Sequence, residues 1–130
     1  PPPIVIDQRS NNICVKGSLP LIGQVMVNLL KNALSASAAV GRAGATVTVA
    51  AEDGFARIEV ADYGTGVSAD AAKTIFTPFS KSARGGMGLG LAICQRIAST
   101  LGGSLSWKNS EAGGAVFTFT VPLEEEDKKQ

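Results

Sequence analysis

Apolar and polar residues alternate along several short segments of the chain, and in two longer segments apolar residues recur every three or four positions. The first pattern predicts strands and the second predicts helices. Alternation predicts strands at residues 46–50, 55–61, 104–108 and 115–121, and the three-to-four spacing predicts helices at residues 19–39 and 89–101. Residues 4–6, a short apolar run, and residues 13–16 are expected to be further strands, and residues 69–75 a third, short helix. The order of strand, helix, hairpin, helix, helix and hairpin predicts an α+β fold. We expect a two-layer α/β sandwich, with a mixed, mostly antiparallel sheet covered on one face by about three helices.

Turn residues separate the predicted elements. Ser18 stands at the N-cap of the first helix, and Pro20 lies in its first turn, where the missing N–H costs no hydrogen bond. Asp53-Gly54 is the two-residue turn of a hairpin. We expect residues 1–17 to be a strand region or linker from an upstream domain, residues 18–123 to be one domain, and residues 124–130 to be a charged tail.

Composition narrows the classes of function. The chain has 130 residues and a net charge of +1, which gives no reason to expect nucleic acid or an anionic membrane as a partner. No segment reaches the ~18 apolar residues of a membrane span, and the first residues do not form a secretory signal. The chain contains no histidine, which excludes any mechanism that needs one within it. Cys14 and Cys94 match no metal-ligand spacing and are expected to be reduced thiols of a cytoplasmic protein.

The predicted helix over residues 19–39 is apolar around most of its circumference, which predicts a buried helix. Five polar residues nevertheless fall within roughly 100° of arc: Gln24, Asn28, Lys31, Asn32 and Ser35. A stripe of this kind is most often a face in contact with solvent. Asparagine is a poor residue for a helix interior, however, and its amide can coordinate a hard cation or donate to phosphate. The stripe therefore predicts either a solvent face or a ligand site.

Two glycine-rich segments are suited to a ligand. Asp62-x-Gly64-x-Gly66 follows a predicted strand, and a carboxylate there can accept a hydrogen bond from an exocyclic amine while the glycines allow close approach. Taken alone, this segment is more typical of an ordinary turn. Residues 86–91 open a predicted helix, whose N-terminal N–H groups suit phosphate. A flexible hinge is the alternative for that segment, which matches neither the Rossmann fingerprint nor the P-loop.

The order and spacing of these segments resemble the ATP-binding catalytic domain of sensor histidine kinases, in the superfamily that includes type II topoisomerases, the Hsp90 chaperone and MutL. The resemblance covers residues 18–123, which would be the ATP-binding kinase domain. The matching segments are Gln24–Ala33 (the N box), Asp62–Gly66 (the G1 box), Ile75–Phe79 (the F box), Gly86–Leu91 (the G2 box) and Gly114–Phe117 with Val121–Leu123 (the closing strand).

The resemblance implies a role for each site residue. Asn32 would coordinate the Mg²⁺ that bridges the ATP phosphates, and Asn28 would line the same pocket. Asp62 would accept a hydrogen bond from the adenine amino group, and Gly64 and Gly66 would shape that end of the site. The loop from about residue 79 to residue 88 would be the ATP lid. Its cofactor-binding residues, with those that open the following helix, would be Phe79, Lys81, Arg84, Gly86, Gly88, Leu89 and Gly90.

The resemblance also implies a reaction. Asn28 takes the place of a glutamate that activates water in the ATP-hydrolysing relatives, and asparagine cannot act as a base. A basic residue often stands in the family at the position of Ser35, and Lys31 is the candidate to replace it as a catalytic residue beside Asn28. We expect transfer of the γ-phosphoryl group of ATP to a histidine of a dimerisation domain outside this chain.

That reaction belongs to two-component signalling, with a response regulator as an indirect partner. The chain alone is expected to be monomeric and the full-length kinase homodimeric. Two alternatives remain. One is a protein serine kinase of the anti-sigma-factor type, and the other is a non-catalytic nucleotide-binding module that regulates a partner.

Overall fold

The computed structural model describes residues 4–8, 19–77 and 90–123. In order, the elements are β1 (Ile4–Gln8), α1 (Leu19–Ala38), β2 (Ala45–Glu52), β3 (Phe55–Asp62), α2 (Ala69–Ala72), α3 (Gly90–Thr100), β4 (Ser104–Asn109) and β5 (Ala115–Pro122). This is the predicted order of strand, helix, hairpin, helix, helix and hairpin. The strand predicted at residues 13–16 and the N-cap predicted at Ser18 lie outside the described residues.

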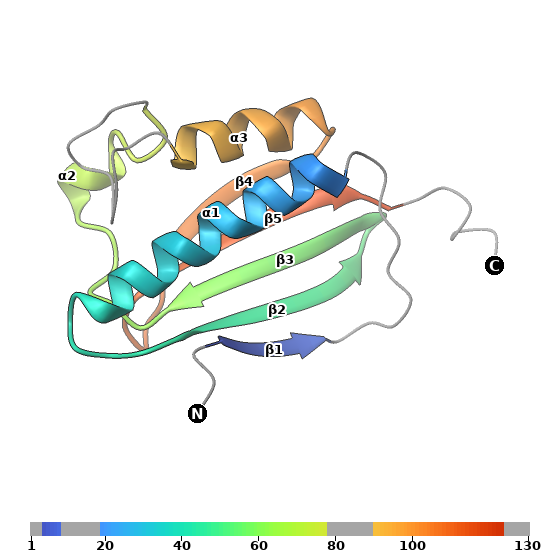
Figure 1. The fold of residues 1–130 in the computed structure, drawn as a ribbon. Coiled ribbons are helices and arrows are strands. Elements are labelled where there is room, and N and C mark those ends of the chain that lie inside the picture. The colour runs from blue at the N-terminus through green and yellow to red at the C-terminus, as the bar shows by residue number, and fades with distance from the viewer. Residues whose placement is uncertain (1–3, 9–18, 78–89, 124–130) are drawn as a thin grey trace.

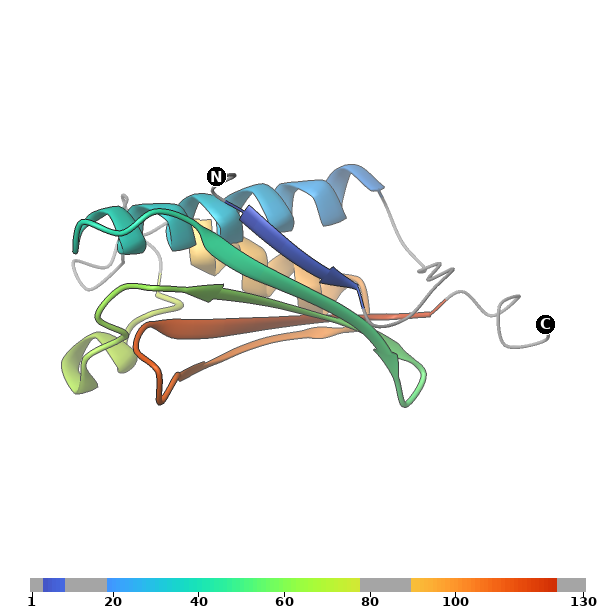
Figure 2. The ribbon, with the colours of Figure 1, turned by 90° about the horizontal axis from the view of Figure 1, so that it is seen from below.

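The five strands form one sheet in the order β1-β2-β3-β5-β4. The pairing of β1 with β2 is parallel, and the other three pairings are antiparallel. Helices α1 and α3 lie side by side on one face of this sheet (Figure 1), with α1 over β2 and β3 and α3 over β4 and β5. The view from below shows strands in front of α3 (Figure 2). The predicted two-layer α+β sandwich is therefore confirmed, and the third helix, α2, lies beyond one end of the sheet.

The hydrophobic core fills the space between the sheet and the two long helices. Alternate residues of β5 are buried, as the period of two along a strand requires when only one face of the sheet is covered. The buried apolar residues of these elements are Ala115, Phe117, Phe119 and Val121 of β5, Val25, Leu29 and Ala33 of α1, and Leu91, Cys94, Ile97 and Ala98 of α3. Among the described residues, no helix covers the opposite face of the sheet.

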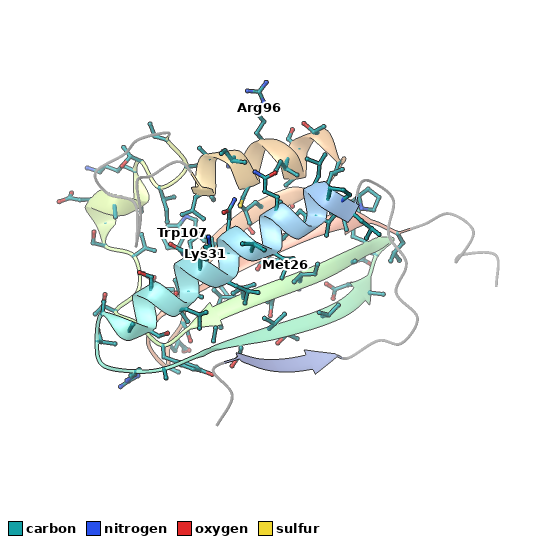
Figure 3. All side chains as sticks on the ribbon, in the orientation of Figure 1. Met26, Lys31, Arg96 and Trp107 are labelled. Atoms are coloured by element: carbon teal, nitrogen blue, oxygen red, sulfur yellow. The ribbon has the colours of Figure 1, made fainter. Side chains whose placement is uncertain are left out.

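Helix α1 is exposed along its outer side, so the prediction of a helix buried on nearly all sides is wrong there. Leu19 is 78% exposed and Val27 is 51% exposed. Met26 packs against the core while Lys31 is exposed (Figure 3). A two-layer fold has no third layer to cover this side of the helix. None of the helices in the described ranges is long and apolar enough to cross a membrane.

Two connections follow the local sequence closely. Asp53 and Gly54 form the hairpin turn predicted between β2 and β3, and both have positive φ, 53° and 83°, as a type I′ turn requires. Helix α2 begins at an N-cap, where the Ser68 hydroxyl accepts a hydrogen bond from the Ala71 N–H. The helix predicted over residues 69–75 is shorter than expected, because i→i+3 hydrogen bonds replace the α-helical pattern after Ala72.

Candidate functional site

Asp62 is the last residue of β3 and is buried, with 2% of its surface exposed. Its Oδ1 atom accepts hydrogen bonds from the backbone N–H groups of Gly64, at 2.9 Å, and Ala115, at 3.2 Å. One donor belongs to the loop that follows Asp62, and the other belongs to the start of β5. Two fixed backbone donors from different segments set the orientation of the carboxylate, so Asp62 is a preformed acceptor at the end of the sheet.

The loop after Asp62 packs tightly against the C-terminal end of α1. A Cβ atom placed on Gly64 would lie 2.7 Å from the carbonyl oxygen of Ala36, which is closer than real Cβ contacts come. Gly66 has a φ of 86°, a conformation that favours glycine. The structure therefore requires glycine at both positions of the predicted Asp-x-Gly-x-Gly segment.

Ser37 ties α1 to this loop and was not identified from the sequence. Its side chain is fully buried; the hydroxyl donates to the carbonyl oxygen of Gly44 at 2.9 Å and accepts from the N–H of Tyr63 at 2.9 Å. The hydroxyl of Tyr63 in turn lies 2.6 Å from that of Thr46 on β2. The available signal was a serine on the apolar face of the helix, five positions after Asn32.

The polar stripe of α1 divides into buried and exposed residues. Asn32 is 7% exposed, and neither its Oδ1 nor its Nδ2 has a hydrogen-bond partner in the described structure. An unsatisfied buried amide costs about 1–3 kcal/mol, so a ligand is the natural partner for this side chain. Gln24 and Lys31 are exposed, whereas Asn28 and Ser35 are half-buried. The solvent-face interpretation thus holds for Gln24 and Lys31 and is wrong for Asn32.

The site extends along α1 in steps of one helical turn. Ala36 contacts the loop at Gly64, Asn32 lies one turn earlier, and Asn28 lies one turn before that. A Cβ atom on Gly90, the first residue of α3, would lie 3.7 Å from the Asn28 side chain. The positive end of the α3 dipole therefore faces the Asn28 end. From Ala36 to Asn28 the strip measures about 12 Å along the helix.

The structure describes only some of the remaining predicted site residues. Lys31 lies on the exposed side of α1, three residues after Asn28 (Figure 3). Six residues of the predicted lid and helix start lie outside the described residues: Phe79, Lys81, Arg84, Gly86, Gly88 and Leu89. The structure thus brings together Asn28, Asn32, Asp62 and the two loop glycines, with Gly90 beside them.

A separate hollow of about 540 Å³ lies at the far end of the open sheet face. Phe55, at the opposite end of β3 from Asp62, is among its lining residues. Arg57 is one of the charged residues that line the hollow. It is already paired with Glu52 at 3.1 Å and with Glu59 at 2.8 Å, and the hydrogen bond with Glu52 raises the pKa of Arg57. The strip on α1 remains the better candidate site.

The family described as "Histidine kinase-, DNA gyrase B-, and HSP90-like ATPase" matches residues 17–125. The chain belongs to this family. The histidine kinase-like ATPase family binds ATP, and the strip between the Asp62 loop and the start of α3 is the candidate site for it. The resemblance predicted from the sequence is confirmed.

Similar sequences come from sensor proteins. The chain is 43% identical over 108 residues to the C4-dicarboxylate transport sensor protein DctS of Rhodobacter capsulatus, an alignment that covers 82% of this chain and 16% of DctS. It is 38% identical over 110 residues to the sensor histidine kinase ZraS of Klebsiella oxytoca, which covers 82% of this chain and 23% of ZraS. The chain therefore spans less than a quarter of the length of these relatives.

Solved structures of histidine kinases share the fold of this member of the histidine kinase-like ATPase family. Full-length ShkA in complex with AMPPNP superposes with a TM-score of 0.78 and 32% sequence identity, over 92% of this chain and 25% of ShkA. The nucleotide-free catalytic domain of the histidine kinase ThkA gives a TM-score of 0.78 and 27% identity, over 92% of this chain and 76% of that domain. The predicted α+β architecture is thus that of histidine kinase catalytic domains.

Cys94 of α3 packs against α1 in this histidine kinase-like ATPase domain. The thiol is fully buried, and its Sγ lies 3.8 Å from the carbonyl oxygen of Val25. Burial raises the pKa of Cys94 to about 11, and a hydrogen bond with the Asn28 side chain offsets part of that rise. The folded state therefore keeps the proton longer than the unfolded state, and this group lowers stability as the pH rises from about 9 to about 11. At neutral pH the thiol is protonated and contributes packing.

Proposed function

We propose that this chain is the catalytic domain of a sensor histidine kinase and transfers the γ-phosphoryl group of ATP to a histidine of a dimerisation domain outside it. The observation that carries this proposal is the amide at Asn28, beside the start of α3. An amide side chain can donate a hydrogen bond to phosphate or coordinate a metal ion, but it cannot take a proton from water. The site therefore favours transfer to another acceptor over hydrolysis. The names of the relatives, which include sensor histidine kinases, support the same activity.

We propose that Asn32 holds Mg²⁺ together with the ATP phosphates. The fit rests on the buried Oδ1 of this amide, which has no partner within the described residues. Magnesium prefers oxygen ligands, and it usually keeps several waters while binding through few protein groups. A single amide oxygen together with phosphate oxygens satisfies that preference. The metal would neutralise charge on the phosphates during transfer.

The same proposal assigns recognition of the adenine ring to Asp62. Its carboxylate, held by the N–H groups of Gly64 and Ala115, would accept a hydrogen bond from the adenine amino group. Gly64 and Gly66 would allow the ring to approach the backbone closely. The phosphates would then extend along α1 past Asn32 toward Asn28 and the N-terminus of α3. Phosphoryl transfer depends mainly on positioning and charge neutralisation, and this arrangement supplies both.

The other predicted residues remain part of the proposal. Lys31, exposed beside Asn28, is the proposed catalytic cation on α1. Phe79, Lys81, Arg84, Gly86, Gly88 and Leu89 stay predictions for the lid and its hinge, together with the described Gly90. We also propose the domain limits of residues 18–123, a cytoplasmic location, a monomeric isolated domain and a homodimeric full-length kinase. A response regulator would receive the phosphoryl group indirectly.

Phosphotransfer in trans tests this function. The acceptor is the full-length protein carrying Asp62→Ala, so that label can arise only through the added 130-residue domain. With γ-labelled ATP and Mg²⁺, we expect label on the acceptor that is lost in acid and stable in base, as a phosphohistidine is. Acid-stable label on serine would instead support the serine kinase alternative. Release of phosphate without labelling would identify an ATPase, and neither label nor hydrolysis would indicate a regulatory module.

Asn32→Ala is expected to remove the Mg²⁺ dependence of ATP binding. Calorimetry should give the variant, in Mg²⁺, the affinity that the unaltered domain has in EDTA. Gln24→Ala, which truncates an exposed side chain on the same helix, is the matched control and should leave the Mg²⁺ dependence unchanged. Stability of the nucleotide-free variant should be kept or raised, because the Asn32 amide makes no hydrogen bond within the described structure. If Mg²⁺ dependence survived in Asn32→Ala, the metal would bind elsewhere.

A further inference from the structure

Asn109, the last residue of β4, makes a two-point contact with a residue 42 positions earlier in the chain. The N–H of Val67 donates to Asn109 Oδ1 at 2.8 Å, and Asn109 Nδ2 donates to the carbonyl oxygen of Val67 at 2.9 Å. One side-chain amide therefore pairs both backbone groups of Val67, as a neighbouring strand would. Val67 itself is buried, at the end of the loop that Asp62 begins.

The contact is close enough to constrain the loop between Asp62 and Val67. A Cβ atom on Gly66 would lie 2.7 Å from Asn109 Oδ1, so the amide reaches its partner only because residue 66 has no side chain. Asn109 is also the register partner of Ala115, whose N–H donates to the Asp62 carboxylate. The β4–β5 hairpin thus holds both ends of this loop, at Asp62 through Ala115 and at Val67 through Asn109.

We propose that Asn109 is a positioning residue for the base of ATP. Two glycines make the loop between Asp62 and Val67 intrinsically free to adopt many conformations. Holding Val67 removes that freedom before the nucleotide binds, so the ordering cost does not weaken binding. Asn109 acts through the loop and does not itself touch the base in this account. The proposal rests on the proposed contact between Asp62 and adenine.

A purely structural role for Asn109 predicts a different result. Asn109 is an exposed residue and its two bonds to Val67 are part-buried, so their contribution to the stability of the fold is expected to be modest. If the two bonds served stability alone, their loss would lower the unfolding temperature and weaken all ligands of the folded site equally. If they position the loop, their loss weakens only ligands that carry the base. Inorganic tripolyphosphate, which has the phosphates of ATP but no adenine, separates these two roles.

The experiment measures ATP and tripolyphosphate affinities, both with Mg²⁺, for the unaltered chain and three variants. Asn109→Ala removes both bonds to Val67. Asn109→Asp keeps the acceptor for the Val67 N–H and replaces the donor with a carboxylate oxygen beside the Val67 carbonyl. Lys108→Ala, the adjacent exposed residue of β4, is the matched control. We expect both Asn109 variants to lose ATP affinity by about tenfold with tripolyphosphate affinity unchanged, and Lys108→Ala to match the unaltered chain.

Three other results would contradict the proposed role of Asn109, and each has a different meaning. Equal losses for ATP and tripolyphosphate in the Asn109 variants would mean a structural role only. An unchanged preference for ATP in Asn109→Ala would mean that the loop is ordered without the amide, and the proposed function would stand. If the unaltered chain bound both ligands equally, the proposed base site would fail, and this proposal with it. Should Asn109→Ala not fold, the more conservative Asn109→Asp decides by the same comparison.

Discussion

Asp62→Asn is expected to lower ATP affinity by about a hundredfold, because a hydrogen bond to a charged group contributes about 1.5–3 kcal/mol. Asparagine keeps the size of the side chain and an oxygen that can accept from the N–H groups of Gly64 and Ala115. Its amide nitrogen, however, meets the adenine amino group as donor against donor. The variant therefore separates recognition of the base from support of the loop. Calorimetric titration with ATP, at fixed Mg²⁺, measures the loss.

Asp62→Ala is the stronger change and should abolish detectable ATP binding. It also leaves the N–H groups of Gly64 and Ala115 without the acceptor they use in the folded chain, so stability should fall as well. Tripolyphosphate provides the control, because its affinity should be nearly unchanged in Asp62→Asn. An ATP affinity equal to that of the unaltered chain in Asp62→Asn would rule out the adenine assignment.

Gly114→Ala is expected to destabilise the fold severely, whereas Gly113→Ala should be tolerated. Both glycines have positive φ, 83° and 104°, which costs an alanine roughly 1–2 kcal/mol. At Gly114 the added Cβ would also lie 2.1 Å from the carbonyl oxygen of Asp62, and backbone atoms cannot move aside cheaply. At Gly113 the nearest atom is 3.9 Å away, at Gly64. The pair therefore isolates the effect of close packing from that of backbone conformation.

Urea unfolding followed by circular dichroism measures both glycine variants. Gly113→Ala should lose about 1–2 kcal/mol, and Gly114→Ala should lose more than about 4 kcal/mol, a large part of the stability of a small domain. Similar small losses in both variants would mean that the β4–β5 hairpin can move away from Asp62. The proposed rigidity of the base end would then be wrong.

Local patterns in the sequence were sufficient to predict the elements and their layers. Alternation along β5 predicts a sheet covered on one face, and Asp53-Gly54 predicts a tight hairpin. Both patterns can be recognised because each depends only on residues that are neighbours in the sequence. The burial of the outer side of α1 was predicted wrongly, because burial of a helix face depends on the whole fold. Whether a helix face is covered depends on how many layers the fold has, and the residues of α1 do not carry that information.

The site was predictable where its residues lie in one segment, and less so where distant segments meet. Asn28 and Asn32 are four positions apart on one helix, and Asp62 lies in the same short loop as its two glycines. Ser37 and Asn109 reach this loop across 26 and 42 positions, so no local pattern marks them. Their residue types gave little indication of a role at the site, since a serine in a helix and an asparagine before a turn are both common.

In the proposed nucleotide site, the one-turn spacing of contacts along α1 would make the number of residues between Asn28 and Ala36 a determinant of ligand choice. A helix rises by a fixed 1.5 Å per residue and cannot stretch. The distance between the Asp62 end, which we assign to adenine, and the Asn28 end, which we assign to the phosphates, is therefore fixed by the number of residues from Asn28 to Ala36. One residue inserted between Asn32 and Ala36 would also rotate Asn32 about the helix axis by roughly 100° relative to the Asp62 loop. Loops elsewhere in the chain can change in length over time, whereas this segment cannot do so without altering which molecule fits.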